Sequence, residues 1–121
     1  MKNVFLLLFT ISMILALRCS STSEFDIVMN VTNPQGKAVK FSGYYLLEAT
    51  GDSVPMGEYT PETYSFTMQK GDRCTGLVYK DTVDVTDTLN LRILSNDDEK
   101  VNLSVTFPYP LQAIQFDITA Q

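Results

Sequence analysis

The sequence predicts an all-β protein, an antiparallel β-sandwich of about seven strands that follows an N-terminal signal segment. After residue 24, apolar side chains alternate with polar ones in short runs, which is the period-two pattern of strands with one buried face. Turn-forming residues separate these runs at intervals of about 8–12 residues. No stretch after residue 24 shows the periodicity of an amphipathic helix.

The first half of this pattern predicts two strands and one irregular segment. Residues 25–32 alternate and form the first strand, which ends at the turn Asn33-Pro34-Gln35-Gly36, where Pro fixes φ and Gly tolerates positive φ. A second strand is expected over residues 37–49, with Gly43 as a bulge or bend. Residues 54–61 contain two prolines, which excludes a central strand and predicts a crossing loop or an irregular edge.

The second half predicts the remaining strands. They are expected at residues 64–69, 73–80, 89–93, 101–107 and 114–118. Residues 82–86 are too few to decide between a short strand and an extended loop. The segments 89–93 and 101–107 share one alternation phase, so we expect a hairpin around the four-residue polar turn 96–99, with a well-specified register.

These strands together favour a sandwich of the immunoglobulin or transthyretin kind. Its core is expected to contain Phe66, Leu91, Ile93, Leu103, Val105 and Phe116. Cys74 lies within a strand pattern and is expected to be buried, because a free cysteine packs as a small hydrophobe. Cys19 is expected to be lipidated or lost by cleavage; a single bridge to Cys74 is the alternative if Cys19 is not acylated.

The N-terminus has the form of an export signal. Lys2 precedes the apolar run 4–17, and Cys19 and a serine-rich stretch follow it. As a helix this run spans roughly 21 Å, less than the ~30 Å of a membrane core. We therefore expect residues 1–18 to be a signal peptide or membrane-targeting segment, residues 19–24 a polar tether, and residues 25–121 the β-sandwich domain.

The end of the apolar run resembles a bacterial lipoprotein signal. The residues are Leu15-Ala16-Leu17-Arg18-Cys19, and the resemblance implies cleavage before Cys19 and lipidation of that residue. Lipoprotein signals carry a small residue directly before the cysteine, and Arg18 departs from this pattern. Ordinary signal-peptide cleavage and an uncleaved anchor are the two alternatives. All three predict an exported protein of the cell envelope, periplasmic or on the outer surface, and otherwise secreted.

Charge and composition exclude several functions. Lys2 and Arg18 are two of the nine basic residues, so the part after residue 18 has seven basic against fourteen acidic residues. Nucleic acid is excluded as a partner, because phosphate binding needs clustered Lys and Arg. The chain has no His, so Ser-His-Asp and Cys-His arrangements are impossible. We expect a non-enzymatic protein without a cofactor.

Two groups of side chains are candidates for binding. The acidic residues gather at Asp81, Asp84 and Asp87 and at Asp97, Asp98 and Glu99. Neither spacing matches a calcium motif, and turn formation explains these residues, so no metal site is expected. Tyr59 and Tyr109 lie beside prolines in expected loops, which makes them the best candidates for contact with a partner.

One segment resembles a known family of envelope proteins. Residues 60–67, Thr-Pro-Glu-Thr-Tyr-Ser-Phe-Thr, are followed by Lys70-Gly71-Asp72 and then by the hairpin. This order resembles the exported domain of the mycobacterial small membrane proteins that accompany large lipid transporters, in which a proline-led strand precedes a Gly-Asp turn. The resemblance implies a small envelope β-domain. It maps no functional residue, and that family carries a longer membrane helix than residues 4–17.

The expected function is that of a non-enzymatic, exported envelope protein, lipoprotein-like, whose sandwich is a binding or structural module for a protein or a surface polymer. Contact with the membrane would come from the lipid anchor or the signal segment. The alternative is a small carrier that holds an apolar ligand in a pocket between its sheets.

Overall fold

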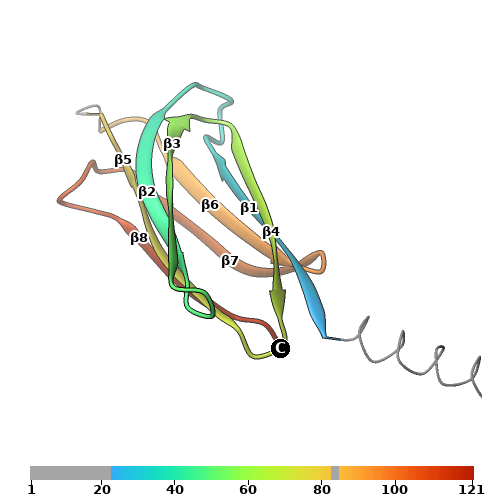
Figure 1. Cartoon of the computed structure of the whole chain (residues 1–121). Helices are drawn as coiled ribbons and strands as arrows, with labels where there is room; N and C mark the ends of the chain where they lie inside the picture. The colour runs from blue at the N-terminus through green and yellow to red at the C-terminus, as the bar shows by residue number, and fades with distance from the viewer. Residues whose placement is uncertain (1–22, 83–84) are drawn as a thin grey trace, which may run out of the picture.

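The computed structural model describes residues 23–82 and 85–121, and over these residues the chain is all-β, as predicted (Figure 1). The strands are β1 Glu24–Thr32, β2 Lys40–Leu47, β3 Asp52–Tyr59, β4 Glu62–Gln69, β5 Arg73–Lys80, β6 Leu89–Ser95, β7 Asp98–Val105 and β8 Ile114–Thr119. The expected signal peptide, Cys19 and the tether up to residue 22 lie outside the described residues. Within the described part there is no helix with the length and apolar character needed to cross a membrane.

Two four-stranded antiparallel sheets make the sandwich. Their strand orders are β4-β1-β6-β7 and β3-β2-β5-β8, and Figure 1 shows them as two layers. The predicted sandwich is therefore confirmed. In the immunoglobulin constant-type order the first strand pairs with the second, whereas here β1 pairs with β4 and β6.

The core lies between the sheets and is built from alternate residues of the strands. The central strands β1 and β6 and the edge strand β8 follow this alternation closely; Ile27, Met29, Leu91 and Ile93 are fully buried. Of the expected core residues, Leu91, Ile93, Val105 and Phe116 are buried, and Phe66 is half-buried against the core. Leu103, the sixth, is 47% exposed, so its expected place in the core is wrong.

The reason for the exposure of Leu103 is its position at an edge. It lies directly across from Leu91 and therefore has the inward phase that its sequence predicts. β7, however, is the last strand of its sheet, so the inward side of Leu103 is not fully covered by the opposite sheet. Alternation identifies the face of a strand, but it carries no information about whether the strand is central or at the edge.

Three local expectations differ from the structure. Residues 54–61 belong largely to β3, a regular strand at the edge of its sheet, where Pro55 is tolerated because one side of the strand has no ladder partner. Gly43 is not a bulge, since β2 keeps its register with both neighbours; a Cβ there would collide with the Leu77 carbonyl oxygen. The hairpin turn is also tighter than expected, with Asn96 and Asp97 as its two central residues, both at positive φ.

The two ends of the sandwich are distinct. The lower end in Figure 1 holds the start of β1, the β4–β5 turn and the C-terminus, joined by hydrogen bonds from Lys70 N to Ser23 O and from Gly71 N to Ala120 O (both 2.7 Å). The upper end holds the segments that follow β1, β5 and β7. Asn33 fixes this end, because its buried side chain donates to Thr88 O (2.8 Å) and accepts from Gln35 N (2.9 Å).

Candidate binding face

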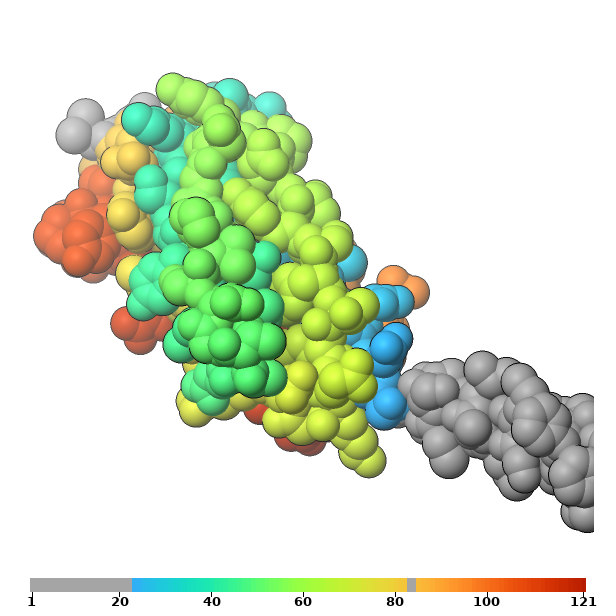
Figure 2. Space-filling view, viewed as in Figure 1, coloured from blue at the N-terminus to red at the C-terminus, as the bar shows by residue number. Residues whose placement is uncertain are grey.

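Four of the six tyrosines belong to one side of the molecule, the outer face of the sheet β3-β2-β5-β8, which we call the tyrosine face. They are Tyr44, Tyr59, Tyr79 and Tyr109. The three strand residues among them lie on outward positions of β2, β3 and β5. Tyr109 comes from the β7–β8 connection, which Figure 2 shows projecting beside the end of β5.

The centre of the tyrosine face is a row of residues that crosses all four strands. Tyr44 pairs with Pro55 on one side and with Leu77 on the other, and Leu77 pairs with Gln115. The Tyr44 side chain is 46% exposed, although β2 is a central strand. The row therefore offers a contiguous, partly apolar strip across this face.

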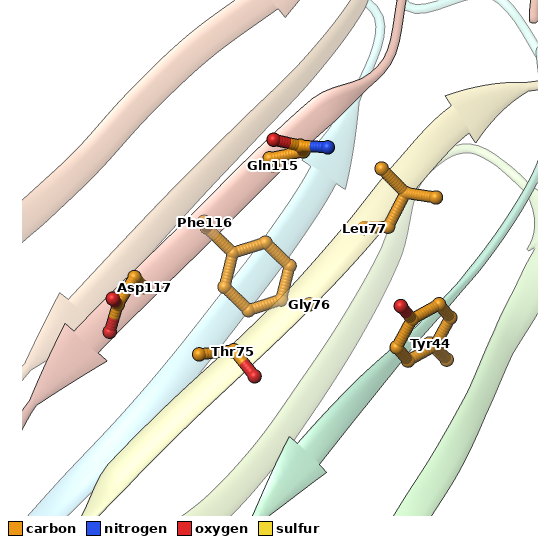
Figure 3. A pocket seen from close by; sticks show the side chains of 7 residues that line it. All are labelled: Tyr44, Thr75, Gly76, Leu77, Gln115, Phe116 and Asp117. Carbon is orange, nitrogen blue, oxygen red and sulfur yellow. The ribbon is translucent and has the colours of Figure 1, made fainter. Parts of the chain in front are cut away.

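A hollow of about 370 Å³ lies beside this row (Figure 3). Tyr44 and Leu77 supply apolar walls, and Thr75, Gln115 and Asp117 supply polar groups. Gly76 and Phe116 line its floor. The Phe116 ring, on the strand position directly across, fills the space that a Cβ at Gly76 would need.

A second hollow, of about 260 Å³, lies at the upper end of the same sheet. Its aromatic wall is the pair Tyr79 and Tyr109, whose ring centroids are 4.7 Å apart. Lys80 lies beneath it and is buried; its Nζ donates to the Thr106 carbonyl oxygen (2.7 Å), which ties the β7–β8 connection to β5. Gln112 Oε1 further orders this connection by accepting from Thr106 N and Phe107 N (both 3.0 Å).

The structure places the two predicted contact residues at the same end of the same sheet. Tyr59 and Tyr109 are 54% and 55% exposed. Tyr59 is the last residue of β3 and does not lie in a loop as expected. β2 separates it from β5, which corresponds to roughly 10 Å across two strand spacings, so the two tyrosines flank the upper end of the face without touching.

Tyr44 and Tyr79 were not identified from the sequence, although a signal for Tyr44 exists. Consecutive strand residues point to opposite faces of a sheet, so the pair Tyr44-Tyr45 must place one ring inside and one outside. Tyr45 is the inner one, stacked on Phe66 at 4.9 Å between centroids, and burial raises its pKa. Tyr79 gives no comparable signal, because its pairing with Tyr109 depends on the path of a loop.

The charged groups on the tyrosine face neutralise one another. Arg73 forms a bidentate pair with Asp117 (2.8 and 2.6 Å) and a second ion pair with Glu48 (3.3 Å). The hydrogen bond from Arg73 holds the pKa of Asp117 below its usual value, so this carboxylate stays ionised at neutral pH. Lys40 is 3.9 Å from Asp81, which also accepts a hydrogen bond from the Ser42 hydroxyl (3.0 Å).

The acidic turn residues do not assemble into a site. Asp87 pairs with Lys37, Glu99 with Arg92 and Asp98 with Lys100. Among the residues that the structure describes, no three side chains of the metal-binding types come together. Asp84 lies outside the described residues.

Cys74 is fully buried on the inner side of β5 and is a free thiol in the described part of the chain. Burial, with the nearby charges of Asp117 and Glu48, raises its pKa to about 11. A protonated, enclosed thiol is a poor nucleophile. The predicted fate of Cys19 stays a prediction, since that residue lies outside the described part.

Neither a protein-family model nor any curated protein matches this chain. The expected likeness to small envelope proteins stays a prediction.

Proposed function

We propose that this chain is a non-enzymatic, exported binding module of the cell envelope, and that the tyrosine face holds an uncharged surface polymer, a polysaccharide. The observation that carries the proposal is the gathering of four tyrosines on one outer sheet face. Three of them are about half exposed, at Tyr44, Tyr59 and Tyr109. The envelope location rests on the apolar run at residues 4–17 and on Cys19.

Aromatic rings lie beside hydrogen-bonding side chains on the tyrosine face, and this arrangement supports a polysaccharide as the ligand. A sugar ring has an apolar C–H face, which stacks on an aromatic ring, and hydroxyl groups at its edge, which need hydrogen-bonding partners. Each of the two hollows joins an aromatic wall to such partners: Thr75 and Gln115 in one, Asp81 and Thr82 in the other. Protein interfaces differ in kind, because they have an apolar centre inside a polar rim.

The charged side chains on the tyrosine face support an uncharged polymer as the ligand, because they pair with one another. Lys40 and Arg73, the two basic side chains that the described strands place on this face, are both in ion pairs with carboxylates. An anionic polymer would have to compete with these pairs and with the excess of acidic residues in the chain. Binding through ring contacts and neutral hydrogen bonds should instead depend little on salt.

The chemistry of the side chains present supports a non-enzymatic role. The chain has no His, and the carboxylate in the larger hollow, Asp117, has a lowered pKa and is held by Arg73. A general acid needs the opposite shift. No described feature favours the apolar-ligand carrier. Of the hollows lined by both sheets, the one between Leu47 and Met68 measures about 60 Å³, far below the size of a usual ligand pocket. Another, between Lys100 and residues 117–119, measures about 250 Å³ and is lined mostly by polar and charged side chains.

The test is co-sedimentation of the full chain, in mild detergent, with insoluble polysaccharides: peptidoglycan, chitin and a neutral glucan. We expect binding to at least one of them that persists in moderate salt and falls at least about fivefold in Tyr44→Ala and Tyr109→Ala, as for buried aromatic contacts elsewhere. Thr67→Ala, an exposed position on the opposite sheet, is the matched control and should bind like wild type.

Two results would contradict the proposal. Binding that vanishes in moderate salt and is intact in both Tyr variants would identify the acidic turns as the binding surface. Retention of an envelope protein but of no polysaccharide, with loss in the Tyr variants, would keep the face but show that its partner is a protein.

A further inference from the structure

The second half of the edge strand β7 has an unusual composition for an edge. Among the described residues, β7 pairs with β6 on one side and has no neighbour in the sheet on the other. Natural sheets usually protect such an edge with charged residues such as Lys, with Pro or with a bulge. In β7 these devices lie at the start of the strand: Asp98, Glu99 and Lys100 are charged, and the register with β6 shifts between Ile93 and Leu94. The last five residues, 101–105, read Val-Asn-Leu-Ser-Val, have a regular register and carry no charge, proline or glycine.

The sandwich has two sides at which edge strands of the two sheets face each other, the β3/β4 side and the β7/β8 side, and these two sides differ. On the β3/β4 side, the Tyr64 hydroxyl accepts a hydrogen bond from Gly57 N (3.2 Å) and thereby joins the two edge strands across the sheets. Tyr45 and Phe66 stack behind it. On the β7/β8 side, Leu103 has the inward phase and is still 47% exposed. An inward apolar side chain is thus uncovered at a sheet edge that has no second neighbouring strand among the described residues.

The uncovered segment is complementary to itself. If two copies of β7 run antiparallel about Leu103, then Val101 meets Val105 of the other copy, Leu103 meets Leu103, and Asn102 meets Ser104. The inner positions are all apolar and the outer positions are hydrogen-bonding side chains. No two charges of the same sign face one another, and such a match is what a two-fold interface requires.

We infer that β7 is a self-association edge, through which a second copy of this chain pairs antiparallel about Leu103 and joins two four-stranded sheets into one of eight strands. The inner side chains of the pair extend the core and cover Leu103. Asn90 orders the outward side chains of β7, because its Nδ2 donates hydrogen bonds to Asn102 Oδ1 and Ser104 Oγ (3.0 and 2.8 Å). A pairing of about five residues lies below the size of stable interfaces, so the dimer should depend on concentration.

The other edge of this sheet gives the matched control. β4 carries Thr63, Ser65 and Thr67 on its exposed side, and its inward residues Tyr64 and Phe66 are already covered. A lysine at Ser65 should leave association unchanged. A lysine at Leu103 would place two like charges opposite each other on the two-fold axis and should prevent it.

The test is analytical ultracentrifugation of the full chain in detergent over a range of concentrations. We expect a monomer–dimer equilibrium for wild type and Ser65→Lys, monomers for Leu103→Lys and for Leu103→Glu, and a restored dimer when the two Leu103 variants are mixed. The restored dimer is the decisive signature, because it requires that both variants fold and that residue 103 of one copy meets residue 103 of the other.

Hydrogen exchange provides a measurement that needs no variant. In wild type, those backbone amides of residues 101–105 that point away from β6 should exchange at least several-fold more slowly at high concentration than at low concentration, while the amides of β4 should not change. A wild type that stays monomeric, a Leu103→Lys chain that still dimerises, or a mixture that stays monomeric would each overturn the inference. Loss of the dimer in Ser65→Lys would show that the interface lies at β4 and not at β7. None of these results depends on whether the tyrosine face binds a polysaccharide.

Discussion

Leu91 and Leu103 offer a matched pair of substitutions, because they are the same residue type on directly opposite positions of β6 and β7. Leu91 is fully buried, so Leu91→Ala should lower the free energy of unfolding by about 3–5 kcal/mol, through lost burial and a residual cavity. Leu103 is 47% exposed. Burying a whole leucine contributes about 1.5–3 kcal/mol, so its half-buried side chain contributes roughly 1 kcal/mol, and water fills the space after Leu103→Ala.

The measurement is urea denaturation followed by far-UV circular dichroism, at a protein concentration low enough to keep the chain monomeric. In thermal melts, each kcal/mol should lower Tm by roughly 4–8 °C for a domain of this size. Equal losses for the two variants would refute the reasoning, since they would mean that β7 packs as an interior strand and that the sandwich is closed on that side.

Three further changes test other parts of the structure. Gly76→Ala should lower the free energy of unfolding by about 1–3 kcal/mol or more, because its Cβ would overlap both the Phe116 ring and the Tyr44 backbone carbonyl oxygen; an unchanged denaturation midpoint would contradict this close approach of β2, β5 and β8. Cys74 should react with a thiol reagent only on unfolding. Because folding raises its pKa from 9.0 to about 11, the protein should also lose stability as the pH rises from 9 to 11, and Cys74→Ser should flatten that part of the pH profile. Asp97→Gly should stabilise the protein by a few tenths to about 1 kcal/mol, since glycine adopts the positive φ of this turn position without strain; a lower midpoint would contradict the turn geometry.

Much of the fold follows from the sequence, because alternation and turn chemistry are local properties. The phase of β1, β4, β6, β7 and β8 could be assigned in this way, including that of Leu103. The segments of β2 and β5 show no such alternation. What alternation does not contain is the order of the strands in the sheets. Three features depend on that order: the partial exposure of Leu103, the regular edge formed by β3, and the position of Gly76 directly opposite Phe116.

The binding face was partly predictable for the same reason. Tyr59 and Tyr109 were identified as exposed from their neighbouring prolines, and both are exposed. That they share one face with Tyr44 and Tyr79 follows from β2, β3 and β5 being neighbours, which pairs residues far apart in the chain. The sequence contains no local record of such pairings.

The direction of β7 limits where two copies could meet. β1 begins at the lower end of the sandwich, and its nine residues at about 3.3 Å each make the body roughly 30 Å long. An antiparallel pairing of β7 sets the lower end of one copy beside the upper end of the other. The two-fold axis of such a pair runs perpendicular to the joined sheet. Two copies held on the same membrane by the residues before Glu24 could therefore pair in this way only with that axis along the membrane normal, which lays the strands of both copies parallel to the membrane. Self-association of anchored copies would thus fix the orientation of the sandwich, with the outer faces of the sheets β3-β2-β5-β8 of both copies turned the same way.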